Sequence, residues 1–181
     1  GMLAGVRLVL GQPRLLLVTF GNMLVSLTFA GAVTTFFPLL GRDLLFSQAA
    51  IGMMFSVRAA VSTVGRFPNS AIARRFGNQS VMFGAIAANI IAMFGIAATT
   101  DQWALTALLG LEGLAFGAYL VSGQTEIANQ TTNENRGAIV GVYATASGIG
   151  GAIAPLLLGM AADAWGVRTV FVITGWALVG G

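Results

Sequence analysis

Long apolar runs dominate this chain of 181 residues. The hydrocarbon core of a bilayer is about 30 Å thick, and an apolar helix of about 20 residues crosses it. Six such runs follow one another, separated by short polar segments, at about 15–40, 49–67, 80–98, 103–122, 138–161 and 169–181. The last run would reach only about 20 Å at 1.5 Å per residue, so we expect the chain to stop inside its sixth helix. The runs predict an all-α, polytopic membrane protein, with a cytoplasmic lead-in at 1–14 and a six-helix transmembrane domain at 15–181.

Composition agrees with a membrane protein and excludes several functions. The chain is 56% apolar with a mean hydropathy of +0.85, above the roughly 45 to 50% of a soluble domain. All nine basic residues are Arg, spread along the chain, so we expect no nucleic-acid partner. Without Cys or His, there is no thiolate nucleophile, no imidazole base and no thiolate or histidine metal site. We expect no enzyme, no cofactor and no metal site, because only Glu112 and hydroxyls remain for catalysis.

The arginines predict which side of the membrane each loop occupies. Six of them lie before the first run or beside the loops after the second and fourth runs: Arg7, Arg14, Arg66, Arg74, Arg75 and Arg136. Only Arg42 and Arg168 lie in the loops on the other side. By the positive-inside rule, the N-terminus and the loops after the second and fourth runs are cytoplasmic. We expect a multi-pass protein of the bacterial inner membrane.

Two segments that follow corresponding runs are similar. "SAIARRFGNQ" (70–79) follows the second run, and "GMAADAWGVR" (159–168) follows the fifth, 89 residues later. Both have Ala at their fourth position, a charge at the fifth and Gly at the eighth. The similarity predicts two three-helix units of opposite orientation, the inverted-repeat arrangement of secondary transporters.

The same segments resemble the major facilitator superfamily. Its cytoplasmic signature reads Gly, any, Leu, Ala, Asp, Arg, any, Gly, often after a basic residue. The matching positions here, in order, are Ser70, Ile72, Ala73, Arg74, Arg75 and Gly77, with Arg66 four residues before them. Arg74 departs from the family's Asp, which puts a charge relay through that position in doubt. The stretch 136–171 is similar to the family's eleventh helix, so the chain resembles the C-terminal six-helix half.

This resemblance implies a transporter of twelve helices, in which two halves rock about a central site. The chain would then be a fragment, or a half that pairs with another chain: the N-terminal half or a second copy. The implied function is secondary active transport of a small solute by alternating access, for example proton-coupled efflux of a drug or metabolite. A receptor or scaffold that shares the fold without transporting is the alternative. Substrate, direction and coupling ion stay open.

Arg58 and Glu112 are charged residues inside apolar runs. Each lies nine residues into its run, counted from Ala49 and Trp103, which places both about 14 Å deep, near the bilayer midplane. Charges at that depth face a bundle interior and are paired or functional. Desolvation would favour the neutral Glu112 and a nearby Arg58 the carboxylate, so a rearrangement could switch its protonation. A permanent structural ion pair is the alternative.

Polar stripes predict a solute or ion pathway. Glu112, Tyr119, Ser122 and Glu126 recur at helical spacing, as do Thr19, Asn22 and Ser26 on the first run. Tyr143 and Ser147 add polar groups on the fifth run. The alternative is plain hydrogen bonding between helices.

A stripe of small residues marks the fifth run. Its members are Gly137, Gly141, Gly148, Pro155 and Gly159. Small residues let membrane helices approach closely, which predicts a packing surface. The alternative is a smooth, kinked face along which this helix slides or bends during transport.

Overall fold

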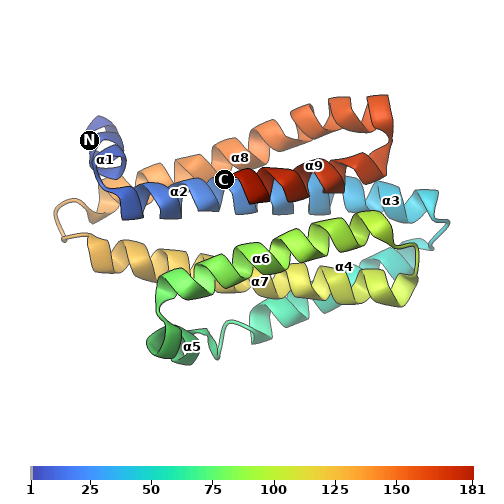
Figure 1. Cartoon of the computed structure of the whole chain (residues 1–181), viewed down its shortest axis with the longest axis horizontal. Coiled ribbons are helices and arrows are strands. Elements are labelled where there is room, and N and C mark those ends of the chain that lie inside the picture. Colours follow the sequence, from blue (N-terminus) through green and yellow to red (C-terminus); the bar gives the residue numbers. More distant parts are fainter. Residues whose placement is uncertain (1) are drawn as a thin grey trace.

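The computed structural model describes residues 2–181, and every regular element among them is helical. In chain order these are α1 (Met2–Gly11), α2 (Pro13–Ser26), the π-helical η1 (Leu27–Phe36), α3 (Phe37–Asp43), α4 (Gln48–Val64), α5 (Asn69–Phe76), α6 (Asn78–Ala98), α7 (Gln102–Gln130), α8 (Arg136–Trp165) and α9 (Val167–Gly180). The long helices lie side by side along one axis, with α1 and α5 at the same end of the bundle (Figure 1). The predicted all-α class is therefore confirmed.

Four helical stretches among the described residues are long and apolar enough to cross a membrane. They are Pro13–Asp43, Asn78–Ala98, Gln102–Gln130 and Arg136–Trp165, with mean hydropathies between 1.5 and 2.1. The first is continuous through α2, η1 and α3. The helices α4 and α9 are shorter, with 17 and 14 residues. Several membrane-crossing helices make the chain multi-pass.

Several elements extend beyond the predicted bounds. α7 continues eight residues past the expected end at 122, to Gln130, and α8 runs from Arg136 to Trp165. Hydropathy detects only the part of a helix inside hydrocarbon, whereas polar residues continue the same helix into water. Two short helices lie outside the predicted runs: most of the lead-in is the helix α1, and part of the segment 70–79 is the helix α5.

The first membrane-crossing helix changes its pitch in the middle. η1 is π-helical over ten residues, between the α-helical α2 and α3. The hydroxyls of Thr34 and Thr35 both donate to the carbonyl oxygen of Ala30, at 2.8 Å. Single-turn π-bulges are the usual form and often lie at functional sites, so a stretch of this length is unusual.

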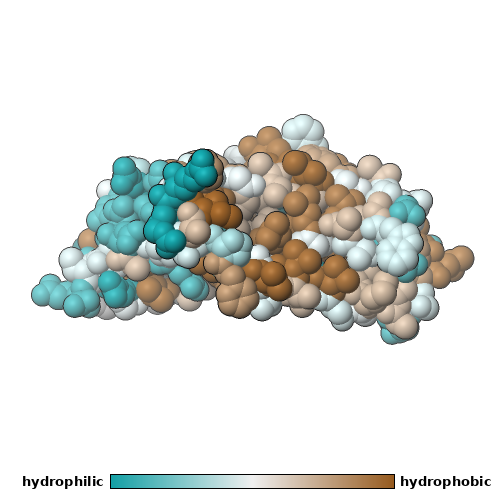
Figure 2. Space-filling view, turned by 90° about the horizontal axis from the view of Figure 1, so that it is seen from below, coloured by the Kyte–Doolittle hydropathy of each residue, from teal (hydrophilic) through white to brown (hydrophobic). Residues whose placement is uncertain are grey.

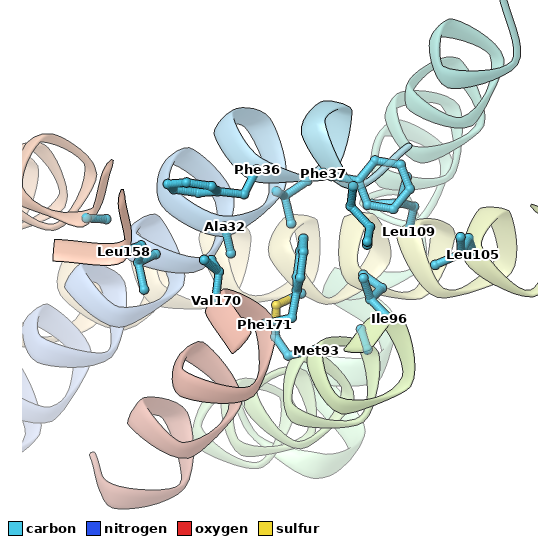
Figure 3. Close-up of a cluster of buried hydrophobic side chains, with 14 of the residues drawn as sticks. Ala32, Phe36, Phe37, Met93, Ile96, Leu105, Leu109, Leu158, Val170 and Phe171 are labelled. Atoms are coloured by element: carbon cyan, nitrogen blue, oxygen red, sulfur yellow. The ribbon is translucent and has the colours of Figure 1, made fainter. Parts of the chain in front are cut away.

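A large apolar cluster joins helices from both ends of the chain. Phe37 of α3 packs edge-on against Phe171 of α9, with ring centroids 6.5 Å apart. Met93 and Ile96 of α6 and Leu109 of α7 complete the cluster around these rings (Figure 3). This packing holds α6, α7 and α9 against the first membrane-crossing helix.

Two glycines with positive φ connect consecutive helices. Gly77, between α5 and α6, has φ 84° and ψ 148°; Gly166, between α8 and α9, has φ 87° and ψ 158°. Each N–H donates at 2.8 Å to the carbonyl oxygen of the residue four positions earlier, Ala73 or Ala162. These residues are the shared Ala and Gly of the two similar segments.

Candidate functional site: a buried ion pair beside a polar cavity

The helices α4 and α7 carry the two charged residues to the same depth. Both helices begin at the same end of the bundle (Figure 1), and Arg58 and Glu112 each lie ten residues after the first residue, Gln48 or Gln102. Ten residues correspond to about 15 Å of helical rise, or half the thickness of the hydrocarbon core.

Glycines on α7 allow α4 to approach closely at this depth. A Cβ at Gly113 would lie 2.6 Å from the carbonyl oxygen of Arg58, and one at Gly117 would lie 2.8 Å from that of Ser62. Only residues without a side chain fit at these two positions. In a membrane, such small residues bring helices together for van der Waals contact. Here they also place Arg58 beside Glu112.

Arg58 and Glu112 form a bidentate ion pair. Nε of Arg58 donates to Oε2 of Glu112, and Nη2 donates to Oε1 at 3.0 Å. Glu112 is fully buried, and the Arg58 residue is 6% exposed. No second ion pair within 4.0 Å occurs among residues 2–181. The planar guanidinium matches both carboxylate oxygens, which is the favourable geometry for a buried pair.

Two aromatic rings cover the guanidinium. Its Cζ lies 4.3 Å from the ring centroid of Phe29 and 5.5 Å from that of Phe116. The two rings are themselves 4.7 Å apart. A cation over an aromatic face is stabilised, and more strongly when water is absent. Because Phe29 belongs to η1, the ion pair contacts the π-helical segment as well as α4 and α7.

The rest of the polar stripe on α7 holds the helix to other elements. The Tyr119 hydroxyl donates at 3.0 Å to the carbonyl oxygen of Val18 on α2. Ser122 accepts from Asn69 of α5 at 3.0 Å, and Glu126 accepts from Asn78 of α6 at 3.5 Å. Because Glu112 contacts Arg58 of α4, the four positions contact four different elements. The contacts of Tyr119, Ser122 and Glu126 are hydrogen bonds between helices, the alternative to a pathway.

A separate cavity lies between α2, α7 and α8. Its volume is about 490 Å³, and its polar lining comes from Asn22, Gln124, Arg136, Tyr143 and Ser147. Asn22 donates at 3.1 Å to the backbone oxygen of Tyr143, and the hydroxyls of Ser26 and Ser147 are hydrogen-bonded. The Tyr143 hydroxyl is buried and has no hydrogen-bond partner within the described residues. Arg58, Glu112 and Tyr119 are not among the lining residues, so the predicted pathway residues do not line one continuous cavity.

Gln124 and Arg136 were not among the predicted pathway residues. Both belong to the polar passage 123–137, which is typical of a loop. Because α7 continues to Gln130 and α8 begins at Arg136, the two side chains lie on helices at the cavity. Gln124 follows Leu120 by four residues, so both lie on one face of α7, and this spacing could have indicated the position only if the helix had been expected to continue past 122.

The residues that resemble the family signature lie on and beside α5. Ser70, Arg74 and Arg75 are exposed, as is Arg66 before the helix, and Gly77 supplies the positive φ at its end. Figure 2 shows hydrophilic residues gathered at one end of the molecule, beside an apolar middle. Asn69, which the sequence did not single out, is buried and joins α5 to Ser122.

The glycine stripe of α8 lies mainly on an open face. A Cβ at Gly137, Gly141 or Gly148 would meet no atom within 4 Å among the described residues, and one at Gly159 would lie 3.9 Å from Phe36. Pro155 lies inside the helix and is half-buried. α8 approaches the first membrane-crossing helix through another glycine, Gly150, against the backbone of Met23. Thus most of the predicted stripe has no packing partner among residues 2–181.

An all-α membrane fold with a buried charge pair and a polar cavity between helices is characteristic of membrane transporters. The sequence profile of the Major Facilitator Superfamily matches residues 18–181. The chain belongs to this family, which confirms the predicted resemblance and the expectation that it is not an enzyme.

Several multidrug resistance proteins are similar to the chain. Multidrug resistance protein MdtG of Enterobacter lignolyticus (strain SCF1) is 25% identical over 174 residues, which cover 94% of this chain and 42% of that protein. Proteins of the same name from Salmonella arizonae and Salmonella newport are 25% identical over 169 residues, 91% of this chain and 42% of theirs. The chain therefore spans 42% of the length of these curated relatives.

Proposed function

We propose that this chain is the C-terminal half of a secondary transporter that moves a small solute across the membrane by alternating access. The observation that carries the proposal is the Arg58–Glu112 pair, buried halfway along two helices of a multi-pass membrane protein. Charges at such a depth are costly and generally mark ion or substrate pathways. The names of the multidrug resistance relatives favour efflux of a drug or metabolite over import.

The proposed half contains six membrane-crossing helices in two inverted repeats. α4 and α9 would complete the set, since both lie alongside long apolar helices (Figure 1). The matching conformations of Gly77 and Gly166 support the repeat, because each glycine leads into the third helix of its proposed unit. The arginines at the end of the bundle with α5 favour a cytoplasmic location for that end.

The solute would occupy the cavity between α2, α7 and α8. Its volume of about 490 Å³ lies within the range of small-molecule sites, which are apolar pockets with a few polar groups. Asn22, Gln124 and the unpaired hydroxyl of Tyr143 supply such groups. Residues of α8 form one wall of the cavity, and a second six-helix half packed against α8 would close it.

Glu112 would respond to protons, with Arg58 as its partner. Protonation would remove the charge attraction between the two side chains, while Phe29 would still stabilise the guanidinium. A pair that is formed in one conformation and broken in another biases the equilibrium between them. Phe29 on η1 would connect this change to the first membrane-crossing helix, which also borders the cavity through Asn22.

The partner would be an N-terminal six-helix half, docked on the open face of α8. Gly137, Gly141 and Gly148 leave this face smooth, which suits close helix contact in a membrane. A second copy of this chain is the other candidate.

Efflux from cells that express the chain together with an N-terminal half tests the proposed function. Glu112→Gln keeps the shape of the side chain and can still accept a hydrogen bond from Arg58, but it cannot ionise, so we expect folded protein of lower stability with little gradient-driven efflux. Glu126→Gln is the matched control, because Glu126 is also a buried carboxylate on α7 but lies near its end. Normal efflux with Glu112→Gln would contradict the proposal and favour a receptor or scaffold.

A further inference from the structure

We infer that an anionic phospholipid binds selectively in a groove between α5, α6, α7 and the turn that follows α4. The groove has a volume of about 580 Å³ and is lined almost entirely by apolar and small residues. Gly84, Ala85 and Ala88 of α6 and Ala115 and Ala118 of α7 form its walls. It does not overlap with the cavity between α2, α7 and α8.

The groove faces the lipid side of a membrane helix. Only 33% of the apolar stretch of α6 is buried inside the described chain. From Ser80 to Ala88, both in the lining, the helix rises about 12 Å. One leaflet of hydrocarbon is about 15 Å thick, half of the full core. The groove thus matches the depth of a single leaflet, and an acyl chain of that leaflet fits its length and its apolar lining.

The helix α5 closes the groove at the membrane surface and carries the positively charged residue beside it, Arg75. Ile72 and Phe76 of this helix line the groove, and they are 44% and 61% exposed. The guanidinium of Arg75 lies over the ring of Phe76, with Cζ 5.5 Å from the centroid. The positive charge of Arg75 therefore lies at the mouth of the apolar groove. Basic sites between membrane helices at this level bind anionic headgroups.

The neighbouring Arg74 lies on the other side of α5. It lines a different, smaller pocket together with Asn78 and Thr125, so it does not share the groove. In Figure 2, hydrophilic side chains at this end of the molecule lie directly beside apolar ones. The two arginines thus have the same charge and nearly the same position, but only Arg75 is placed to contact a headgroup in the groove.

Native mass spectrometry of the full chain in detergent measures this selectivity, with dioleoyl phosphatidylglycerol and dioleoyl phosphatidylcholine as probes. We expect the chain to retain phosphatidylglycerol in preference to phosphatidylcholine. Arg75→Gln should lower that preference about fivefold, the contribution of one basic residue near a membrane surface. Arg74→Gln should leave it unchanged. Equal retention of the two lipids, or equal effects of the two substitutions, would overturn the inference.

A second pair of variants tests whether the acyl chain of the lipid lies in the groove. A Cβ at Gly84 meets no atom within 4 Å, so Gly84→Phe should fill the groove without disturbing the fold and should reduce retention of phosphatidylglycerol. Ala87→Phe, at an exposed position of α6 outside the lining, should not reduce it. Should Gly84→Phe fail to fold, Ala88→Leu serves the same purpose. Unchanged retention in the folded groove variant, or a rise in melting temperature with inorganic phosphate equal to that with phosphatidylglycerol, would exclude a lipid site.

Discussion

Gly113 of α7 lies directly against the backbone of Arg58 on α4, where a Cβ would be 2.6 Å from the Arg58 carbonyl oxygen. The ion pair depends on this close approach of the two helices. We predict that Gly113→Ala lowers the free energy of unfolding by about 1 to 3 kcal/mol, because the added methyl group forces α4 away. Thermal unfolding of the purified chain in detergent measures the change.

Gly110 provides the matched control for that substitution. It lies three residues earlier on the same helix, but a Cβ there would be 3.8 Å from Val61, an ordinary contact. Gly110→Ala should therefore be neutral or slightly stabilising, since Ala favours helix more than Gly does. Equal losses at both positions would argue against a specific contact at Gly113.

Gly77 and Gly166 should both resist replacement. Their φ values of 84° and 87°, combined with ψ near 150°, belong to a region that residues with a side chain rarely adopt. We expect Gly77→Ala and Gly166→Ala each to cost about 1 to 3 kcal/mol of stability. Gly141→Ala, in open space within a helix, is the control and should cost nothing. If either substitution had no effect on the melting temperature, the strained conformation would be in doubt.

Single cysteines test the orientation of the chain, which has no Cys of its own. Asn133 lies in the turn between α7 and α8, and Thr100 lies in the turn between α6 and α7 at the other end. We predict that a membrane-impermeant maleimide applied to intact cells labels Thr100→Cys but not Asn133→Cys, because the arginines favour a cytoplasmic location for the α7–α8 turn. The reverse pattern would invert the proposed topology.

The open face of α8 should be needed for assembly but not for folding. Gly141→Leu with Gly148→Leu adds bulk where no described atom lies within 4 Å, so the chain should keep its melting temperature. Co-purification with an N-terminal half should fall sharply, because small residues at such a contact let helices approach. Gly84→Leu, equally unhindered but on α6, should assemble normally. Unchanged co-purification of the double variant would move the interface elsewhere.

The fold class and the central pair were predictable from the sequence for simple reasons. Apolar runs reveal membrane-crossing helices because hydrocarbon accepts few charges. The pairing of Arg58 with Glu112 could be predicted because both lie the same number of residues from the start of their helices, and helical rise then places them at the same depth in the membrane. Neither inference required knowledge of which helix faces which.

The sequence could not show which face of each helix contacts which neighbouring helix. The glycines of α8 and those of α7 have similar helical spacings, yet Gly113 touches α4 whereas Gly141 meets open space. The same uncertainty applied to Tyr119, which belonged to a predicted pathway but bonds to the backbone of α2. The role of such residues depends on how the helices are placed around them, and periodicity within one helix contains no such information.

We propose that the Arg58–Glu112 pair couples transport to protons and does more than hold α4 to α7. Loss of one partner leaves a buried charge and should cost about 3 to 5 kcal/mol of stability. This cost is expected whether the pair couples transport to protons or is only structural. The double variant Arg58→Leu with Glu112→Leu removes both charges and should restore folding, so its efflux separates the two roles. Proton-gradient-driven efflux by this variant, assembled with an N-terminal half, is the most direct measurement. Folded protein without coupled efflux is the result we predict, and full coupled efflux would show that the pair is only structural.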